Sequence, residues 1–368
     1  RNVRLGRIKN TLEAHLLAAL GWHQEAIARF LELVKKSPED VDLMLALAWS
    51  LGRSGDLDEA RSWLERGWKL AGAQPASRQY LGCVLTGARL ELLASKPSAA
   101  RDWLERLTDR SLAGSDWVRL LAETYRRQQD WPGGIAAMVR VAPELEGRAQ
   151  RDAEAMEAEF RLRVDDPRAW RRLRPLLDSP QLEDVLSGLQ VLQALERWQD
   201  LAREGAAAGA RFPDSRDILF ARGAAHERLG EGTAAEDVFL RLLETDPGDA
   251  SAANYLGYMW ADRGENLERA LELISLAVAR EPDNVAYLDS LGWVHFRLGN
   301  LDEAERWLRR AVELDGSEAD GTMLCHLGEV LLAKEERDEG RRLLQLGLGR
   351  GCEDADRLRS LLDRAGDG

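Results

Sequence analysis

The sequence predicts an all-α fold in which one helical hairpin is repeated along the chain. Apolar residues return every three to four positions through most of the 368 residues, which is the period of an amphipathic helix. No stretch alternates apolar and polar residues as a half-buried strand does. Gly, Pro and Asp interrupt the helical pattern about every dozen residues, so the predicted helices are short and numerous.

The repeat is clearest in three segments that share one spacing of small and large residues. GWHQEAIARFLEL (21–33), GDLDEARSWLERG (55–67) and GNLDEAERWLRRA (299–311) each open with Gly, place Ala five residues later and a large apolar residue four residues after that. Four of the steps between neighbouring small residues are 34 or 35 residues long, and such a period indicates stacked helical hairpins. The small residue falls at Ala26, Ala60, Ala100, Gly134, Ala235, Ala270, Ala304 and Gly340.

Each element of the predicted hairpin has a local justification. The first helix carries Gly after Leu, as at Gly257 and Gly292, where a small residue allows close approach to the second helix. The second helix begins with acidic residues such as Asp302 and Glu303, which the helix dipole favours in the first turn. Proline stops the second helix twelve residues after the small position or its equivalent, at Pro38, Pro213, Pro247 and Pro282.

The repeat signature divides the chain into four segments. We expect regular N-terminal repeats at 1–141, degenerate helical repeats at 142–212, regular C-terminal repeats at 213–352, and a capping helix with a tail at 353–368. An insertion at 86–99 stretches one repeat to forty residues. Irregularities of this kind mark a bend, a packing change or a binding feature in a repeat protein.

These landmarks resemble the tetratricopeptide repeat family, whose pattern is W-x2-L-G-x2-Y followed by A, F, A and P. Leu291, Gly292, Ala304, Leu308 and Ala311 carry the best match, and the two preceding repeats match nearly as well. The resemblance implies a right-handed α-α superhelix, a solenoid of about ten helical hairpins that covers nearly the whole chain. It also implies a function in binding other proteins along the concave surface.

Composition and charge narrow the classes of partner. The net charge of −13 and the pI near 5.1 disfavour nucleic acid, because the chain as a whole repels phosphate. No run of eighteen apolar residues is present, so no transmembrane segment is predicted. The three cysteines lack metal-type spacing and leave the redox compartment open. Because the chain opens at Arg1 without Met, we expect a processed or shortened form.

The sequence offers no constellation for catalysis. The five histidines form no HExxH motif and no i,i+4 pair, and CxxC is absent, so no metal ligands are predicted. Cys325 and His326 are helical neighbours that point in different directions, which disfavours a nucleophile–base pair. The glycines of WPGGI (131–135) and RLGEGTAA (228–235) join helices, not a strand and a helix. We therefore predict no enzyme and no cofactor.

Candidate protein-binding residues follow from repeat position and family geometry. Side chains just after the small residue of the first helix are expected to face the concave groove, and aromatic and Arg side chains are common anchors of recognition surfaces. An equally weighted alternative is that these rings fill gaps between adjacent first helices. The candidates are Trp49, Phe220, Asn254, Tyr258, Asp289, Trp293, Phe296 and Arg297.

Two further groups of residues bear on the partner. Asn254 fits the carboxylate clamp of chaperone-binding family members, but no Lys occupies a groove position in the C-terminal repeats, which argues against a chaperone-tail adaptor. An Arg cluster in the middle of the chain is interpreted as a solvated outer face, with an acidic partner as the alternative. It comprises Arg161, Arg163, Arg168, Arg171, Arg172 and Arg174.

The predicted function is that of a scaffold or adaptor for a protein or peptide. One alternative is a constitutive structural or assembly subunit of a larger bacterial complex, or a homo-oligomer. Another is the repeat region of a longer enzyme. The segments YLGYMWADRG, LDSLGWVHFRLG and CHLGEVL also resemble bacterial envelope repeat proteins, some of which deliver substrates to a carboxy-terminal-processing protease. That resemblance favours the periplasm or envelope over the cytoplasm and leaves the compartment open.

Overall fold

The structure, a computed structural model, describes residues 2–72, 74–75, 77–316, 319–352 and 354–366. Within these residues it contains 21 α-helices, two short 3-10 helices and no β-strand, which confirms the predicted all-α class. The chain divides into two compact units, residues 1–196 and 197–368. The boundary between them falls inside the segment 142–212, where the repeat signature is weak.

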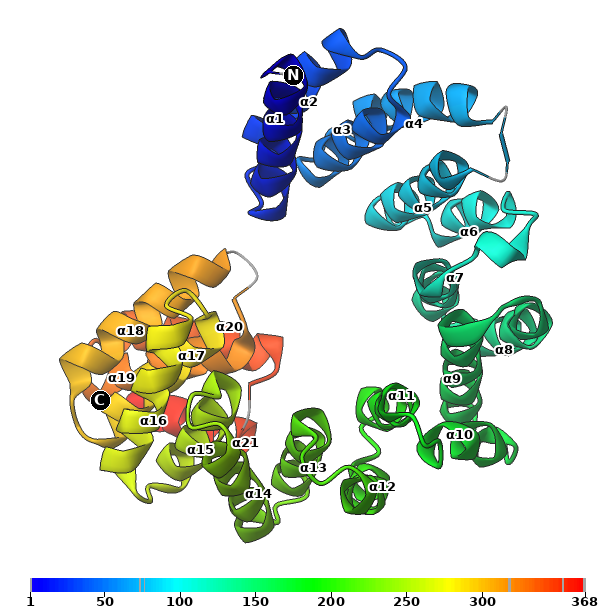
Figure 1. Ribbon diagram of the computed structural model, residues 1–368. Helices are drawn as coiled ribbons and strands as arrows, with labels where there is room; N and C mark the ends of the chain where they lie inside the picture. Colours follow the sequence, from blue (N-terminus) through cyan, green and yellow to red (C-terminus); the bar gives the residue numbers. More distant parts are fainter. Residues whose placement is uncertain (1, 73, 76, 317–318, 353, 367–368) are drawn as a thin grey trace. The chain divides into compact units, whose positions relative to one another are not determined.

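The first unit is a series of helices joined by short turns (Figure 1). Its apolar core surrounds large, fully buried side chains such as Phe30, Leu104, Trp117 and Phe160. The helices are α1 (Asn2–Ala19), α2 (His23–Lys36), α3 (Val41–Arg53), α4 (Leu57–Ala71), α5 (Arg78–Leu93), α6 (Pro97–Glu105), α7 (Ser115–Gln128), α8 (Trp131–Val141), α9 (Gly147–Arg163), α10 (Ala169–Leu177) and α11 (Leu182–Ala194). The 3-10 turns Arg110–Leu112 and Ala142–Glu144 follow α6 and α8.

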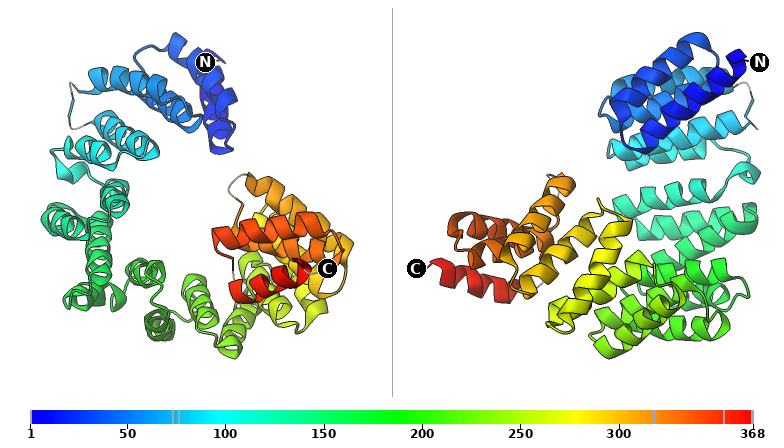
Figure 2. Two further views of the ribbon diagram at one scale, coloured as in Figure 1. Left: turned by 180° about the vertical axis from the view of Figure 1, so that it is seen from behind. Right: turned by 60° about the vertical axis from the view of Figure 1, so that its left-hand side comes forward.

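The second unit consists of one helix, four regular hairpins and a final helix (Figures 1 and 2). We call α13, α15, α17 and α19 its first helices, and α14, α16, α18 and α20 its second helices. Residue 353 and residues 367–368 of the predicted cap lie outside the described residues. The helices are α12 (Trp198–Arg211), α13 (Arg216–Arg228), α14 (Gly232–Thr245), α15 (Ala250–Arg263), α16 (Leu267–Arg280), α17 (Val285–Arg297), α18 (Leu301–Asp315), α19 (Gly321–Ala333), α20 (Arg337–Arg350) and α21 (Ala355–Gly366).

The hairpins explain the small residues of the repeat. Consecutive helices pair as α1/α2, α3/α4, α5/α6, α7/α8 and α9/α10 in the first unit and as α13/α14, α15/α16, α17/α18 and α19/α20 in the second, which gives nine hairpins where about ten were predicted. A Cβ atom at Gly292 would lie 2.5 Å from Leu308 Cγ and 3.1 Å from the carbonyl oxygen of Ala304. At Gly257 the corresponding distance to Ile274 Cγ1 is 2.6 Å. The two helices of a hairpin therefore approach too closely for any side chain at these positions.

Polar side chains fix where many helices begin. Asp40, Asp56, Asp130 and Asp249 precede helices, and each accepts a hydrogen bond from the backbone N–H three residues later. These are N-caps, each of which stabilises a helix by about 1 kcal/mol. Between α17 and α18, Gly299 adopts a φ of 81°, which glycine tolerates without strain.

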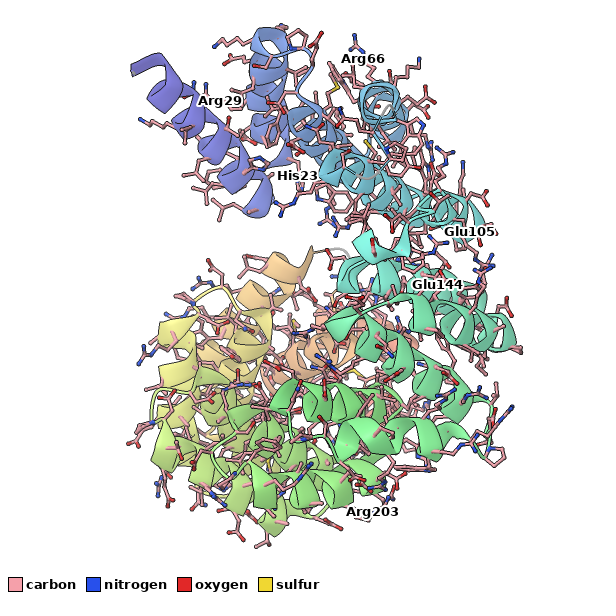
Figure 3. All side chains as sticks on the ribbon, turned by 45° about the vertical axis from the view of Figure 1, so that its right-hand side comes forward. His23, Arg29, Arg66, Glu105, Glu144 and Arg203 are labelled. Carbon is pink, nitrogen blue, oxygen red and sulfur yellow. A yellow bond between two sulfur atoms is a disulfide. The ribbon has the colours of Figure 1, made fainter. Side chains whose placement is uncertain are left out.

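Charged side chains are spread over the surface of each unit, and several of them join neighbouring repeats (Figure 3). Glu105, labelled there, lies 3.9 Å from Arg140. Exposed pairs of this kind contribute little to stability, whereas partly buried, bidentate pairs contribute more. Four pairs of the stronger kind link residues 30 or 33 positions apart: Arg61–Glu91, Arg126–Glu159, Arg216–Asp249 and Arg309–Glu339.

The arginines of the middle cluster are mostly exposed, and several of them also pair with acids of the same unit. Glu157 on α9 is 1% exposed and accepts hydrogen bonds from Arg161 and Arg172 at 2.7 and 3.1 Å. Arg161 and Arg168 both pair with Asp166. Much of this cluster therefore neutralises carboxylates of the chain's own fold, because a buried carboxylate without a partner is strongly unfavourable.

Candidate functional site

A recess of about 460 Å³ runs across the first helices of the second unit. We call it the groove recess. Its walls combine apolar, aromatic and acidic side chains from the end of α13, the middle of α15, the start of α17 and the start of α19, together with Asp315 at the end of α18. The lining residues are Glu227, Arg228, Asn254, Tyr255, Tyr258, Met259, Val285, Ala286, Asp289, Ser290, Asp315, Asp320, Thr322 and Met323.

A smaller recess of about 120 Å³ shares Tyr258 and Thr322 with the groove recess. We call it the cap recess, because the final helix α21 forms one of its walls. Arg357 of α21 donates to both oxygens of Glu329 at 2.7 Å. The remaining lining residues are Asp262, Trp293, Cys325, His326, Cys352, Asp354 and Leu358.

The two recesses bring together only part of the predicted set of binding residues. Asn254, Tyr258 and Asp289 line the groove recess, and Tyr258 and Trp293 line the cap recess. Trp49 lies on α3 in the first unit, where the guanidinium of Arg53 is 6.0 Å from its ring centroid.

The other three predicted residues pack against neighbouring rings or backbone. Phe220 contacts Tyr255 edge to face, with ring centroids 5.3 Å apart. Phe296 lies against Trp293 at 5.2 Å. Arg297 donates a hydrogen bond to the backbone carbonyl of Asp262, so its guanidinium joins α17 to α15.

The placement of Trp293 corrects the expectation that its ring is offered to a partner. Its exposed fraction is 3%, and it stacks on His326 with ring centroids 4.1 Å apart and planes at 18°. Trp293 belongs to α17 and His326 to α19, so this ring fills the gap between adjacent first helices. This packing favours the gap-filling alternative for Trp293.

Asn254 is a buried polar side chain with an unused acceptor. It is 9% exposed and lines the groove recess, and its Oδ1 has no hydrogen-bond partner among the described residues. Leaving such an acceptor unpaired costs about 1–3 kcal/mol. A hydrogen-bond donor that enters the recess would remove that cost.

A buried His–Asp pair lies beneath the recesses. Nδ1 of His326 is 3.0 and 3.1 Å from the two carboxylate oxygens of Asp289. Burial lowers the pKa of His326, but the charge and hydrogen bond of Asp289 raise it, as do the charges of Glu329 and Asp262. The net pKa of His326 lies above its ordinary value of 6.5.

Sequence reasoning missed Glu329 and His326 as residues of the site. The register that selects Tyr258 and Trp293, one residue after the Leu-Gly of the first helix, also selects Glu329 after Leu327-Gly328. The repeat position of Glu329 was therefore visible in the sequence. No repeat position indicates His326, because its partner Asp289 lies 37 residues away in the chain.

The cysteines divide into a linked pair and a buried thiol. Cys325 of α19 and Cys352, which precedes α21, form a disulfide with Cα atoms 6.5 Å apart. Cys83 is free and buried, and burial together with the nearby charge of Asp42 raises its pKa to about 12. A thiol with that pKa is a poor nucleophile at neutral pH.

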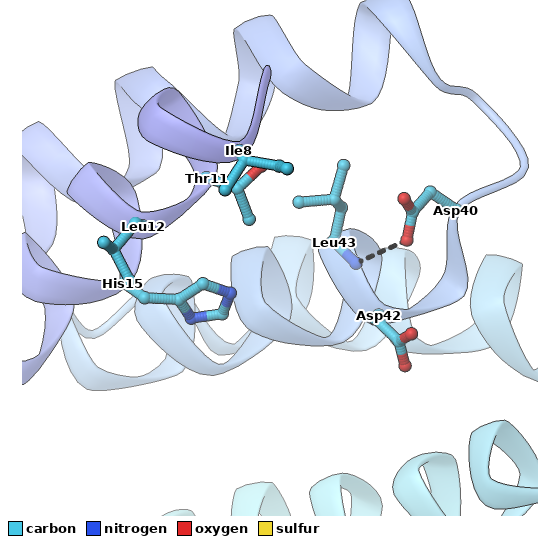
Figure 4. Close-up of a pocket in the computed structure, with 7 residues that line it drawn as sticks. All are labelled: Ile8, Thr11, Leu12, His15, Asp40, Asp42 and Leu43. Carbon is cyan, nitrogen blue, oxygen red and sulfur yellow. Dashed lines mark hydrogen bonds between the residues drawn. The ribbon is translucent and has the colours of Figure 1, made fainter. Parts of the chain in front are cut away.

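The first unit carries a separate apolar surface on α1. Ile8, Leu12, Leu16 and Leu20 recur every four residues and are 57–69% exposed. Ile8 and Leu12 line a pocket together with Thr11, His15, Asp40, Asp42 and Leu43 (Figure 4). The four-residue spacing is visible in the sequence and was not singled out as a candidate surface.

Within the described part of the chain, no group of three or more His, Cys, Asp or Glu side chains is arranged to hold a metal ion. No described helix has both the length and the apolar character needed to cross a bilayer.

Comparison with known proteins places the chain in a family. The chain is 34% identical over 137 residues to the TPR repeat-containing protein PA4667 of Pseudomonas aeruginosa, a match that spans 37% of this chain and 22% of that relative. The solved structures that it resembles include TTC0263 of Thermus thermophilus (23% identity, TM-score 0.41, covering 50% of this chain and 97% of that one) and yeast Tom70 (12%, 0.49, 98% and 88%). The profile of the family described as Tetratricopeptide repeat matches residues 11–75, 189–250, 235–284 and 261–319. Since these segments make up more than half of the sequence, the chain belongs to the tetratricopeptide repeat family.

Proposed function

We propose that this chain is a non-enzymatic scaffold that binds a segment of another protein in the groove recess. Tetratricopeptide repeats are generally scaffolds for protein interactions and are typically non-enzymatic. The observation that carries the proposal is the groove recess itself, which is lined by side chains from the four successive first helices α13, α15, α17 and α19. Such a surface suits an elongated ligand better than a compact small molecule.

The dimensions of the repeats set the length of the expected ligand. Packed helices lie about 8–10 Å apart, and an extended chain advances about 3.3 Å per residue. Each step between adjacent first helices therefore accommodates about three ligand residues. An extended segment that crosses four first helices is about nine residues long.

The chemistry of the two recesses supports a role without catalysis. The His326–Asp289 pair lies beneath the ring of Trp293, which leaves little of the imidazole accessible to a substrate. The neighbouring Cys325 is held in a disulfide and offers no free thiolate.

Site-specific photo-crosslinking tests the proposal. A benzoylphenylalanine introduced in place of Tyr258 is expected to capture a partner in native cells, because this position opens into both recesses. The matched control carries the same probe in place of Glu272, which is exposed on the second helix α16. Capture from position 272 with none from position 258 would contradict the proposal.

The apolar stripe of α1 favours a second candidate function, a constitutive subunit of a larger assembly. Exposed apolar stripes mark sites of interaction with other proteins or membranes, and permanent interfaces are the more apolar class. Replacing Leu12 and Leu16 by Glu is expected to release the chain from such an assembly in size-exclusion chromatography of native extracts. Leu346→Glu, at a site 45% exposed on α20, is the control. An unchanged elution position of the Leu12/Leu16 variant would remove this candidate.

A further inference from the structure

We propose that the groove recess selects an extended segment that carries lysine or arginine side chains. The inference rests on the proposed function and specifies the chemical class of the partner. Three features support it: uncompensated negative charge, an unused buried acceptor, and aromatic walls suited to a cationic side chain.

Negative charge dominates the lining of the groove and cap recesses. Seven carboxylates line them, against two guanidinium groups and His326. Both guanidinium groups lie near acids of the same lining: Arg357 pairs with Glu329, and Arg228 lies 3.6 Å from Glu227. The recesses therefore hold more negative charge than their own cations neutralise.

Two acids of the groove recess form no ion pair with a Lys or Arg of the described residues. They are Asp315 and Asp320. Asp315 and Asp320 instead accept backbone N–H groups, from Asp320 and Thr322 respectively. A cation brought in by a ligand would meet carboxylates whose Coulombic attraction is not already satisfied.

Asn254 supplies an independent indication of a ligand. It is 91% removed from solvent, and its Oδ1 accepts nothing from the described residues. A backbone N–H or a side-chain ammonium of a bound segment is a donor of the required type. A carboxylate of a bound segment cannot donate a hydrogen bond to Oδ1 of Asn254, and the carboxylates of the lining would repel it. The recess is therefore expected to bind acidic segments more weakly than basic ones.

The walls of the groove recess suit the long stem of a basic side chain. Tyr255 and Tyr258 place aromatic rings in the wall of the recess, where an ammonium or guanidinium group can make a cation–π contact that desolvation strengthens. Met259, Val285 and Met323 add apolar surface against which a methylene stem packs. The charged end of the side chain then lies near Asp315 and Asp320.

Fluorescence anisotropy with three labelled nonapeptide pools tests the inference. Each pool carries three lysines, three glutamines or three glutamates at the same fixed positions, and the other positions are randomised. We expect the lysine pool to bind at least about tenfold more tightly than the glutamine pool, and the glutamate pool not to bind.

Two charge-matched variants separate the recess from the overall charge of the protein. The recess variant combines Asp315→Asn with Asp320→Asn, and the control combines Glu268→Gln with Glu272→Gln on α16, where both glutamates are exposed. The recess variant is expected to lose at least about fivefold in affinity for the lysine pool, while the control changes less than about twofold. Thermal melting confirms that both variants are folded.

The outcomes distinguish the inference from the function on which it rests. Equal losses in the two variants would show that overall charge attracts the peptide and would overturn the inference. Binding of the glutamine or glutamate pool as tight as that of the lysine pool would overturn the cationic class and leave the proposed function standing. Failure of all three pools to bind would overturn both.

Discussion

The disulfide between Cys325 and Cys352 is expected to contribute measurably to the stability of the last hairpin. The two cysteines are 27 residues apart, and the loop between them contains the whole of α20. In the chain-entropy treatment, a closed loop of this length removes about 12 cal/mol/K from the unfolded state, which corresponds to about 3.5 kcal/mol at 25 °C. Cys352 is 7% exposed, and Cys352→Ala removes this constraint without placing a polar group at that buried position.

Hydrogen exchange of the α20 amides measures the loss. A stability change of about 3.5 kcal/mol lowers protection by about 300-fold when opening is local and closing is fast. A reductant is expected to reproduce the effect in the wild-type chain and to change nothing in Cys352→Ala. Cys83→Ala, which removes the free thiol of the first unit, is the control.

One result would refute the reasoning directly. If α20 exchanged at the same rate in Cys352→Ala and in the unreduced wild type, the bond would contribute no stability to this hairpin. Equal exchange in reduced and unreduced wild type, with faster exchange in the variant, would assign the effect to lost packing of Cys352 and not to the covalent bond.

Two further predictions concern the second unit. Because the pKa of His326 is raised above 6.5 in the folded chain, protonation stabilises the fold fully below pH 6.5, and this contribution is lost as pH rises through the folded pKa. Urea titrations at increasing pH above 6.5 are expected to show falling stability, and a slope that persists unchanged in His326→Phe would contradict this assignment. Ala304→Trp is expected to lower the melting temperature through overpacking of about 1–3 kcal/mol or more, because Ala304 is fully buried opposite Gly292. An unchanged melting temperature would show that the helices are not in the register described, and the exposed substitution Ala279→Trp is the control.

The hairpins were predictable because their determinants are local. Gly292, Ala304 and Leu308 lie within one repeat, and their spacing alone places them against one another. The same spacing recurs with a period near 34 residues, so each repeat supports the interpretation of the next. Sequence periodicity is therefore a strong predictor of this fold class.

The candidate site was predictable only in part, because its details depend on contacts between repeats. Periodicity shows that Trp293 and Tyr258 share a face of the first helix, but not what the following repeat places opposite them. For Trp293 that residue is His326, which covers the ring. The disulfide depends similarly on how the segment before α21 returns to α19, which no spacing of cysteines reveals.

The Arg cluster illustrates the same difficulty for charges. The sequence shows six arginines in a short segment, and both of the weighed interpretations placed them in contact with solvent or a partner. The buried acids that they meet, such as Glu157, lie on the same amphipathic helices as exposed acids. Burial of a carboxylate becomes apparent only when α9 and α10 are packed together.

The disulfide also determines how the second unit responds to mechanical tension. When the chain is pulled from its C-terminal end, only the residues after Cys352 extend freely, by about 3.3–3.6 Å each. The force then passes through the covalent bond to Cys325 on α19, so α20 carries no load. In an optical trap, the chain is expected to extend as α21 unfolds and then to stop extending until α19 unfolds. After reduction of the disulfide, α20 would unfold directly after α21. In the oxidised chain, α20 is therefore shielded from the pulling force of a machine that threads the chain from this end, whereas α19 bears it.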